Sequence, residues 1–175
     1  WRELQEKTAS VATHLKQLGV KPGDRVVAYM PNIPETIIAF LAAASLGAVW
    51  SSCSPEFGVE STLSRFQQIE PKVLLTVDGY RYNGQSFDRM ETVHELMEGL
   101  PSVEQVILVP YLNGQPAISK LKNLSLWEEV VTKKGELTFA QVPFDHPLWI
   151  LYSSGTTGLP KAIVQGHGGI LLAHL

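Results

Sequence analysis

Residues 149–161, Trp-Ile-Leu-Tyr-Ser-Ser-Gly-Thr-Thr-Gly-Leu-Pro-Lys, bring hydroxyl groups, glycines and a cation close together in the sequence. Gly155 and Gly158 allow the backbone to turn so that successive N–H groups point into one concavity, which suits an anion. Lys161 adds a positive charge, and hydroxyl donors come from Ser153, Ser154, Thr156 and Thr157. Together these groups suit a ligand with several negative oxygens, such as a polyphosphate. The alternative is a polar surface hairpin, because short glycine-rich motifs also arise by chance.

The residues around this loop predict an α/β fold with a mostly parallel sheet flanked by helices. Apolar residues 148–152 predict a buried strand that leads directly into the loop. Hydrophobic periodicity and capping signals upstream predict helices over residues 1–18, 34–46, 60–69 and 88–100, and a short one after Ser125. β-Branched apolar runs predict strands over residues 25–30, 48–51, 72–77 and 103–109. Strands and helices that alternate in this way form a parallel sheet covered on both faces, and ligands bind at the carboxyl ends of its strands.

Polar residues mark the expected helix starts and connections. Asn32, Asp88 and Ser125 are the expected N-caps of three of the helices. Residues 78–85, rich in glycine, tyrosine and asparagine, are expected to form a loop. Residues 111–124 lack a clear period, so we expect them to form an excursion on the surface.

Composition describes a globular protein with little electrostatic character. The chain has 175 residues, of which 45% are hydrophobic and 18% charged, and its formal net charge is −3. No cluster of basic residues supports binding to nucleic acid or to a membrane surface, and no apolar run is long enough to cross a bilayer. The single cysteine, Cys53, excludes an internal disulfide and fits a reducing compartment.

Other phosphate and acyl-transfer motifs fit the loop poorly. A Walker loop places Ser or Thr after its lysine, whereas Ala162 follows Lys161. A dinucleotide fingerprint begins at Gly166 but has Leu171 where its third glycine belongs. The nucleophile elbow Gly-x-Ser-x-Gly does not occur, which disfavours a serine hydrolase.

Metal and thiol chemistry also find little support in the sequence. His94 and Glu95 begin like a zinc-protease helix, but Glu98 stands where the second histidine belongs. His167 and His174 have no acidic or thiol companion nearby, so a surface or capping role fits them better. Cys53 is expected to be a small packed residue instead of a nucleophile.

Residues 151–161, Leu-Tyr-Ser-Ser-Gly-Thr-Thr-Gly-Leu-Pro-Lys, resemble the phosphate-loop motif of the acyl-adenylate-forming enzymes. These include acyl-CoA synthetases, luciferases and nonribosomal-peptide adenylation domains. Within that family, residues 47–58, 68–74 and 163–171 resemble the acetoacetyl-CoA synthetases, with acetyl- and propionyl-CoA synthetases as the nearest relatives. The resemblance runs the full length of the chain.

This resemblance implies an acid–thiol ligase with two half-reactions. A carboxylate such as acetoacetate attacks ATP to give an acyl-adenylate and pyrophosphate, and the thiol of CoA then displaces AMP. Ser153, Ser154, Gly155, Thr156, Thr157, Gly158 and Lys161 would bind the ATP phosphates, with Thr156 and Lys161 acting in catalysis and Mg²⁺ neutralising charge. Arg81 matches an arginine that contacts a phosphate of CoA in acetyl-CoA synthetases, but their second arginine is replaced here by Gly84 or Gln85.

The same resemblance implies that residues 1–175 are part of a large N-terminal AMP-binding domain. We expect the chain to be a piece of a longer protein, truncated at both ends and lacking the C-terminal domain, and to be inactive alone. Adenine, ribose and magnesium sites and a late catalytic lysine would lie beyond Leu175. The alternatives are an acetyl- or propionyl-CoA synthetase, or a non-catalytic module that binds nucleotide or CoA. The expected partners are the small molecules acetoacetate, ATP and CoA, and the expected location is the cytosol.

Overall fold

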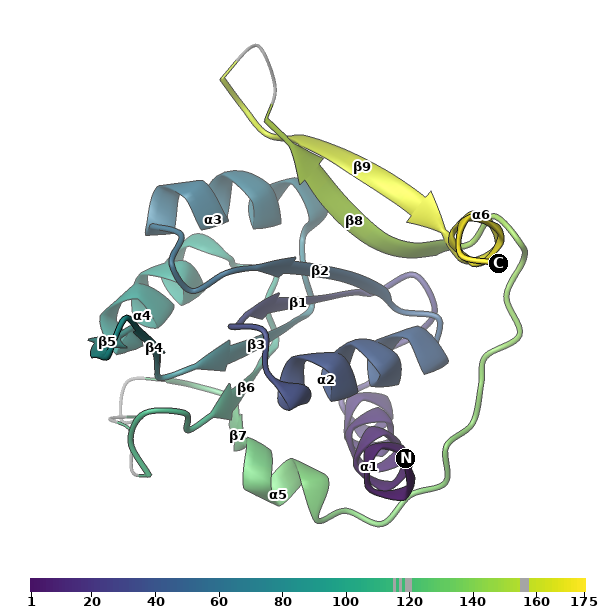
Figure 1. Cartoon of the computed structure of the whole chain (residues 1–175), viewed down its shortest axis with the longest axis horizontal. Helices are drawn as coiled ribbons and strands as arrows, with labels where there is room; N and C mark the ends of the chain where they lie inside the picture. The colour runs from purple at the N-terminus through teal and green to yellow at the C-terminus, as the bar shows by residue number, and fades with distance from the viewer. Residues whose placement is uncertain (115, 117, 119–120, 155–157) are drawn as a thin grey trace.

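The main sheet has the order β7-β6-β3-β1-β2-β8-β9 in the computed structural model, which describes residues 1–114, 116, 118, 121–154 and 158–175 (Figure 1). Its strands are β1 (Arg25–Tyr29), β2 (Val49–Cys53), β3 (Val73–Val77), β6 (Gln105–Val109), β7 (Leu124–Leu126), β8 (Pro147–Ser153) and β9 (Lys161–Gly166). Every neighbouring pair is parallel except β8 and β9, which are antiparallel. The prediction of a mostly parallel α/β sheet is therefore confirmed.

Helices cover both faces of this sheet. The helices are α1 (Arg2–Gln17), α2 (Pro34–Ser45), α3 (Val59–Phe66), α4 (Met90–Gly99), α5 (Trp127–Val131) and α6 (His167–Ala173), with a 3₁₀ turn η1 (Gln67–Ile69) after α3. Helices α1, α2 and α5 pack on one face, where Val26 and Ala28 of β1 point, and α3 and α4 pack on the other, with Val27 and Tyr29. Successive side chains of a strand point to opposite faces, so β1 contributes to both cores.

Strand β8 joins the sheet beside β2, far away in the sequence. Trp50 of β2 pairs with Trp149 of β8. The Ser51 hydroxyl donates a hydrogen bond to the Ile150 carbonyl, 2.7 Å away, and this bond joins residues 99 positions apart. The segment between α5 and β8 runs around the outside of α1 and α2 (Figure 1), where the Ala140 N–H donates to the Ser45 carbonyl. This path brings the end of β8 to the carboxyl edge of the parallel strands.

Two regions differ from the sequence predictions. Residues 78–85 were predicted to form a loop, but they contain β4 (Gly79–Tyr82) and the start of β5 (Gln85–Asp88), an antiparallel hairpin outside the main sheet. Its turn is Asn83-Gly84, and both residues have positive φ, at 48° and 74°. Two-residue turns of this kind favour Asn-Gly because their twist matches that of the flanking strands. The predicted surface excursion also ends in a strand, because β7 pairs with β6.

The expected caps are only partly correct. Asn32 does not cap α2; the helix starts after Ile33 with Pro34 at its first turn, where a missing N–H costs nothing. Asp88 accepts a hydrogen bond from the Met90 N–H at 2.8 Å, but the cap position of α4 falls on Arg89, one residue later than predicted. At α5 the cap position falls on Leu126 instead of Ser125.

Candidate functional site

The predicted phosphate loop is the tip of the hairpin between β8 and β9. Strand β8 ends at Ser153 and β9 begins at Lys161, and these two residues pair across the hairpin. Ser153, Ser154 and Lys161 are all exposed. Gly158 has φ of 91°, which side chains rarely adopt, so a glycine is required there. Gly155, Thr156 and Thr157 lie outside the described residues.

The position of the loop agrees with a binding role. Strand β8 runs parallel to β2, so its last residues lie at the carboxyl edge of the sheet, where ligands of α/β proteins bind. Strand β9, which was not predicted from the sequence, returns antiparallel along β8 and forms the sheet edge. Ser153 and Lys161 are thereby held side by side, with a hydroxyl donor and an ammonium group on facing strands.

Helix α3 and the turn after it hold both arms of this hairpin. The Tyr152 hydroxyl donates to the Arg65 carbonyl at 2.8 Å. On the other arm, the side-chain amide of Gln68 donates to the Pro160 carbonyl at 3.0 Å. Burial raises the pKa of the Tyr152 hydroxyl to about 12, so this group stays protonated and remains a donor at neutral pH. The sequence did not reveal these contacts, because they join residues 87 and 92 positions apart.

The Arg65 side chain adds a further contact at this place. Its guanidinium carbon lies 5.0 Å from the centre of the Phe57 ring and 5.9 Å from that of Tyr152. Cations over aromatic faces within about 6 Å are attracted by the ring quadrupole. The end of β8 is therefore packed against the loop that follows β2 as well as against α3.

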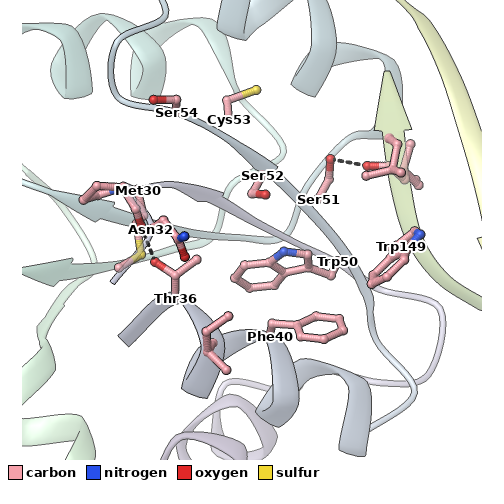
Figure 2. A pocket seen from close by; sticks show the side chains of 14 residues that line it. Met30, Asn32, Thr36, Phe40, Trp50, Ser51, Ser52, Cys53, Ser54 and Trp149 are labelled. Carbon is pink, nitrogen blue, oxygen red and sulfur yellow. Dashed lines mark hydrogen bonds between the residues drawn. The ribbon is translucent and has the colours of Figure 1, made fainter. Parts of the chain in front are cut away.

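A pocket of about 610 Å³ opens on the α2 side of the same edge (Figure 2). Aromatic rings form one of its walls: Phe40 lies 5.9 Å from Trp50 and 5.7 Å from Trp149, measured between ring centres. Figure 2 shows hydroxyl groups of Ser52 and Thr36 beside them. Such a pocket suits a largely apolar group with a few polar atoms. Ser153, Ser154 and Lys161 do not line it, so the pocket and the loop are neighbours and not one cavity.

Cys53, at the end of β2, lines the pocket but is not suited to act as a nucleophile. Its side chain is buried, and burial raises the pKa of the thiol to about 12. A thiol must lose its proton to become a good nucleophile, and this one stays protonated at neutral pH. The structure agrees with the prediction that Cys53 is a packed residue.

Arg81 lies on the separate β4–β5 hairpin, where it is exposed and pairs with Ser86. Fully buried Asp78 anchors the base of this hairpin. Its carboxylate accepts three backbone N–H bonds, from Tyr111 and Leu112 at 2.7 and 2.8 Å and from Asn113 at 2.7 Å.

These bonds tie the end of β3 to the segment that follows β6. A methyl group at Gly79 would come within 2.4 Å of Leu112, so hairpin and segment are in close contact. The structure places Arg81 and Lys161 on different hairpins: Arg81 on β4–β5, outside the main sheet, and Lys161 on β8–β9, which forms an edge of the main sheet.

Comparison with known protein families shows to which family this chain belongs. A model described as AMP-binding enzyme matches residues 1–174. The chain belongs to the AMP-binding enzyme family. It is 44% identical to an acetoacetyl-CoA synthetase of Gallus gallus over all of its residues, and 38% identical to a malonamoyl-CoA synthetase of Penicillium aethiopicum over 99% of them. These matches cover 27% and 25% of the two relatives, so the chain spans about a quarter of their length.

The fold of this AMP-binding enzyme is likewise shared with a solved structure. The acetoacetyl-CoA synthetase from Streptomyces lividans superposes with a TM-score of 0.94 and 55% sequence identity, over 99% of this chain and 26% of that chain. The family recognised from residues 151–161 is therefore confirmed.

The described residues of this AMP-binding enzyme offer no clear set of side chains to hold a metal ion. Within the described ranges, no three His, Cys, Asp or Glu side chains gather as a metal site would require. The loop offers hydroxyls and an ammonium group, which bind phosphate oxygens directly. No helix in the described part of the chain is long and apolar enough to cross a membrane.

Proposed function

We propose that the protein containing this chain is an ATP-dependent acid–thiol ligase that joins acetoacetate to CoA through an acetoacetyl-adenylate. The observation that carries the proposal is similarity along the whole chain to proteins named acetoacetyl-CoA synthetase, at 44% identity for that of Gallus gallus and 55% for that of Streptomyces lividans. Residues 1–175 would be part of the N-terminal adenylation domain, and the C-terminal domain would lie outside them.

The similarity to a malonamoyl-CoA synthetase favours one class of acid as the substrate of the proposed ligase. Malonamate and acetoacetate share a three-carbon chain that ends in a carboxylate and bears a carbonyl at the third carbon. They differ only in an amino group where acetoacetate has a methyl group. Two relatives named for such acids favour a short 3-oxo acid as the substrate over an unsubstituted acid such as acetate.

The loop would act in the first half-reaction. The carboxylate oxygen attacks the α-phosphorus of ATP, the bond to the pyrophosphate oxygen breaks, and negative charge builds up on the departing pyrophosphate. Donors already in place around that charge lower the barrier, and Ser153, Ser154 and Lys161 are such donors. Gly155, Thr156 and Thr157 would complete the set, with Thr156 and Lys161 as the catalytic pair. A bound Mg²⁺ would neutralise phosphate charge, with ligands from outside the described residues.

CoA would enter in the second half-reaction, when its thiol displaces AMP from the adenylate. Arg81 is exposed on the β4–β5 hairpin, which follows the carboxyl end of β3. Its guanidinium group is therefore accessible to a phosphate of CoA. Guanidinium groups suit phosphates because their planar donors match two oxygens at once. The substrates are small and water-soluble, which fits an enzyme of the cytosol.

Supplying different acids to the full-length protein tests this proposal. Acetoacetate, malonamate, propionate and acetate would be compared by pyrophosphate release and by thioester formation with CoA. We expect acetoacetate to give the highest kcat/KM. Faster turnover of acetate or propionate would assign the protein to acetyl- or propionyl-CoA synthesis. Binding of ATP or CoA without pyrophosphate release from any acid would indicate a non-catalytic module.

A further inference from the structure

One contact between distant parts of the chain reaches the residue directly before Lys161. The Gln68 amide nitrogen lies 3.0 Å from the Pro160 carbonyl oxygen, and 2.5 Å from the Ser64 carbonyl oxygen in α3. A side-chain amide has two N–H donors, and both are therefore used. The bond to Ser64 fixes the amide of Gln68, which lies in η1, against the preceding helix α3, so the bond to Pro160 ties the hairpin to a rigid element.

We propose that Gln68 is a positioning residue that places the Lys161 ammonium group for the departing pyrophosphate. This inference rests on the function proposed above. Pro160 has a fixed φ and no N–H, so its carbonyl is its one backbone hydrogen-bonding group. That carbonyl belongs to the peptide bond that joins Pro160 to Lys161. Holding the carbonyl sets the direction in which β9 leaves the loop, and with it the starting point of the Lys161 side chain.

The other arm of the hairpin, β8, is tethered separately from the Gln68–Pro160 bond. Tyr152 is fixed on Arg65 of α3 by its hydroxyl, and Ser153 follows it directly. Since Ser153 pairs with Lys161, the two tethers hold both sides of that pair on one support. Loss of the Gln68 bond releases only the Lys161 side. The ammonium group can then shift relative to the Ser153 donor while the strand pairing of the hairpin persists.

Gln68→Met in the full-length enzyme tests the role, because methionine keeps the length of the side chain and has no donor. Gln67→Met is the matched control. Gln67 is the neighbouring residue and is also exposed, and its amide donates at 3.0 Å to the Gly99 carbonyl, away from the hairpin. The first half-reaction is measured by exchange of pyrophosphate into ATP without CoA. The second is measured by preloading enzyme with adenylate in the presence of pyrophosphatase and mixing it with CoA.

We expect Gln68→Met to slow pyrophosphate exchange about three- to tenfold, the scale of one net hydrogen bond, and to leave thioester formation unchanged. Gln67→Met should change neither rate. General damage to the fold would slow both half-reactions, so equal slowing of both steps would overturn the positioning role.

A double variant sharpens the result. If Gln68 acts through Lys161, Gln68→Met should have little further effect in a Lys161→Ala background, because coupled residues are not additive. Fully additive effects would contradict the inference. If the wild-type enzyme exchanges pyrophosphate and both Gln68→Met and Gln67→Met exchange it at the wild-type rate, the role of Gln68 is overturned and the proposed function stands. Wild-type enzyme that exchanges no pyrophosphate with any acid would overturn the proposed function and this role together.

Discussion

Replacing Asp78 by asparagine is expected to loosen the backbone of residues 111–113 beneath the β4–β5 hairpin. The Asp78 side chain is fully buried, and its carboxylate accepts the three N–H bonds of that segment. One carboxylate oxygen accepts the bonds from Tyr111 and Leu112, and the other accepts the bond from Asn113. An asparagine in the same place keeps one oxygen but turns an NH₂ group toward a neighbouring N–H. One bond is then lost and two donors face each other.

The size of the effect follows from these bonds. A hydrogen bond to a charged group contributes about 1.5–3 kcal/mol, and a buried donor left without a partner costs about 1–3 kcal/mol. Removing a buried charge offsets part of this loss, because a neutral amide costs less to take out of water. We therefore expect the segment to lose about 2–3 kcal/mol of local stability. That range corresponds to roughly 30- to 150-fold faster amide exchange, since each 1.4 kcal/mol is a factor of ten.

Hydrogen exchange followed by mass spectrometry on the full-length protein measures this directly, because it reports local opening of residues 111–113. Asp88→Asn is the control: Asp88 is exposed and accepts a single backbone bond, from Met90 at 2.8 Å. That variant should leave exchange at residues 111–113 unchanged. If Asp78→Asn raises exchange there by less than threefold, the carboxylate does not anchor the segment and the reasoning is refuted.

Three further predictions concern catalysis, pH and packing. Lys161→Ala in the full-length protein should slow pyrophosphate exchange about a hundredfold or more, the scale for losing one preorganised donor, and an unchanged rate would mean that the loop has another role. Burial lowers the pKa of His14, so the folded state resists its protonation. Stability should therefore fall as the pH drops below about 6.5, the usual histidine pKa, by at most about 1.4 kcal/mol per pH unit, and urea unfolding should show a weaker pH dependence in His14→Gln. Gly79→Ala would place a methyl group 2.3 Å from the Phe87 carbonyl oxygen and should lower the unfolding temperature. At Gly114 no atom of the described residues lies within 4 Å of an added methyl group, so Gly114→Ala should leave that temperature nearly unchanged in the same melting experiment.

The parallel strands and main helices were predictable because their hydrophobic period matches their burial. Strand β3 is buried along its whole length, as an apolar run in a parallel sheet should be. The β4–β5 hairpin was missed although Asn83-Gly84 is a strong turn signal. Both of its strands have only four residues, and Arg81, Tyr82, Gln85 and Ser86 beside the turn are exposed, so neither strand has the apolar, half-buried run that normally identifies one. Strand β9 was missed for the same reason, since Ile163 and Val164 are adjacent, apolar and both exposed.

The candidate site was predictable in its residue types but not in its supports. Hydroxyls, glycines and a lysine within one short segment favour an anion-binding loop on chemical grounds, and this stays a prediction. The contact between Gln68 and Pro160 depends on which helix lies beside the hairpin, and no local pattern encodes that. Asp78 shows the same limit, because an aspartate after a strand predicts a loop whether its carboxylate faces solvent or a buried backbone.

The insertion of β8 beside β2 sets the order in which the protein acquires its site during synthesis. Strands β1, β2, β3, β6 and β7 all lie within residues 25–126, so the pairing among these five strands can form as soon as those residues leave the ribosome. Strand β8 must close a loop of nearly a hundred residues, from Ser51 to Ile150, before it finds its partner. Contacts between such distant residues form slowly. The hairpin that carries Lys161 therefore docks onto a sheet that already exists, and most of this region is folded before the proposed phosphate loop is in place.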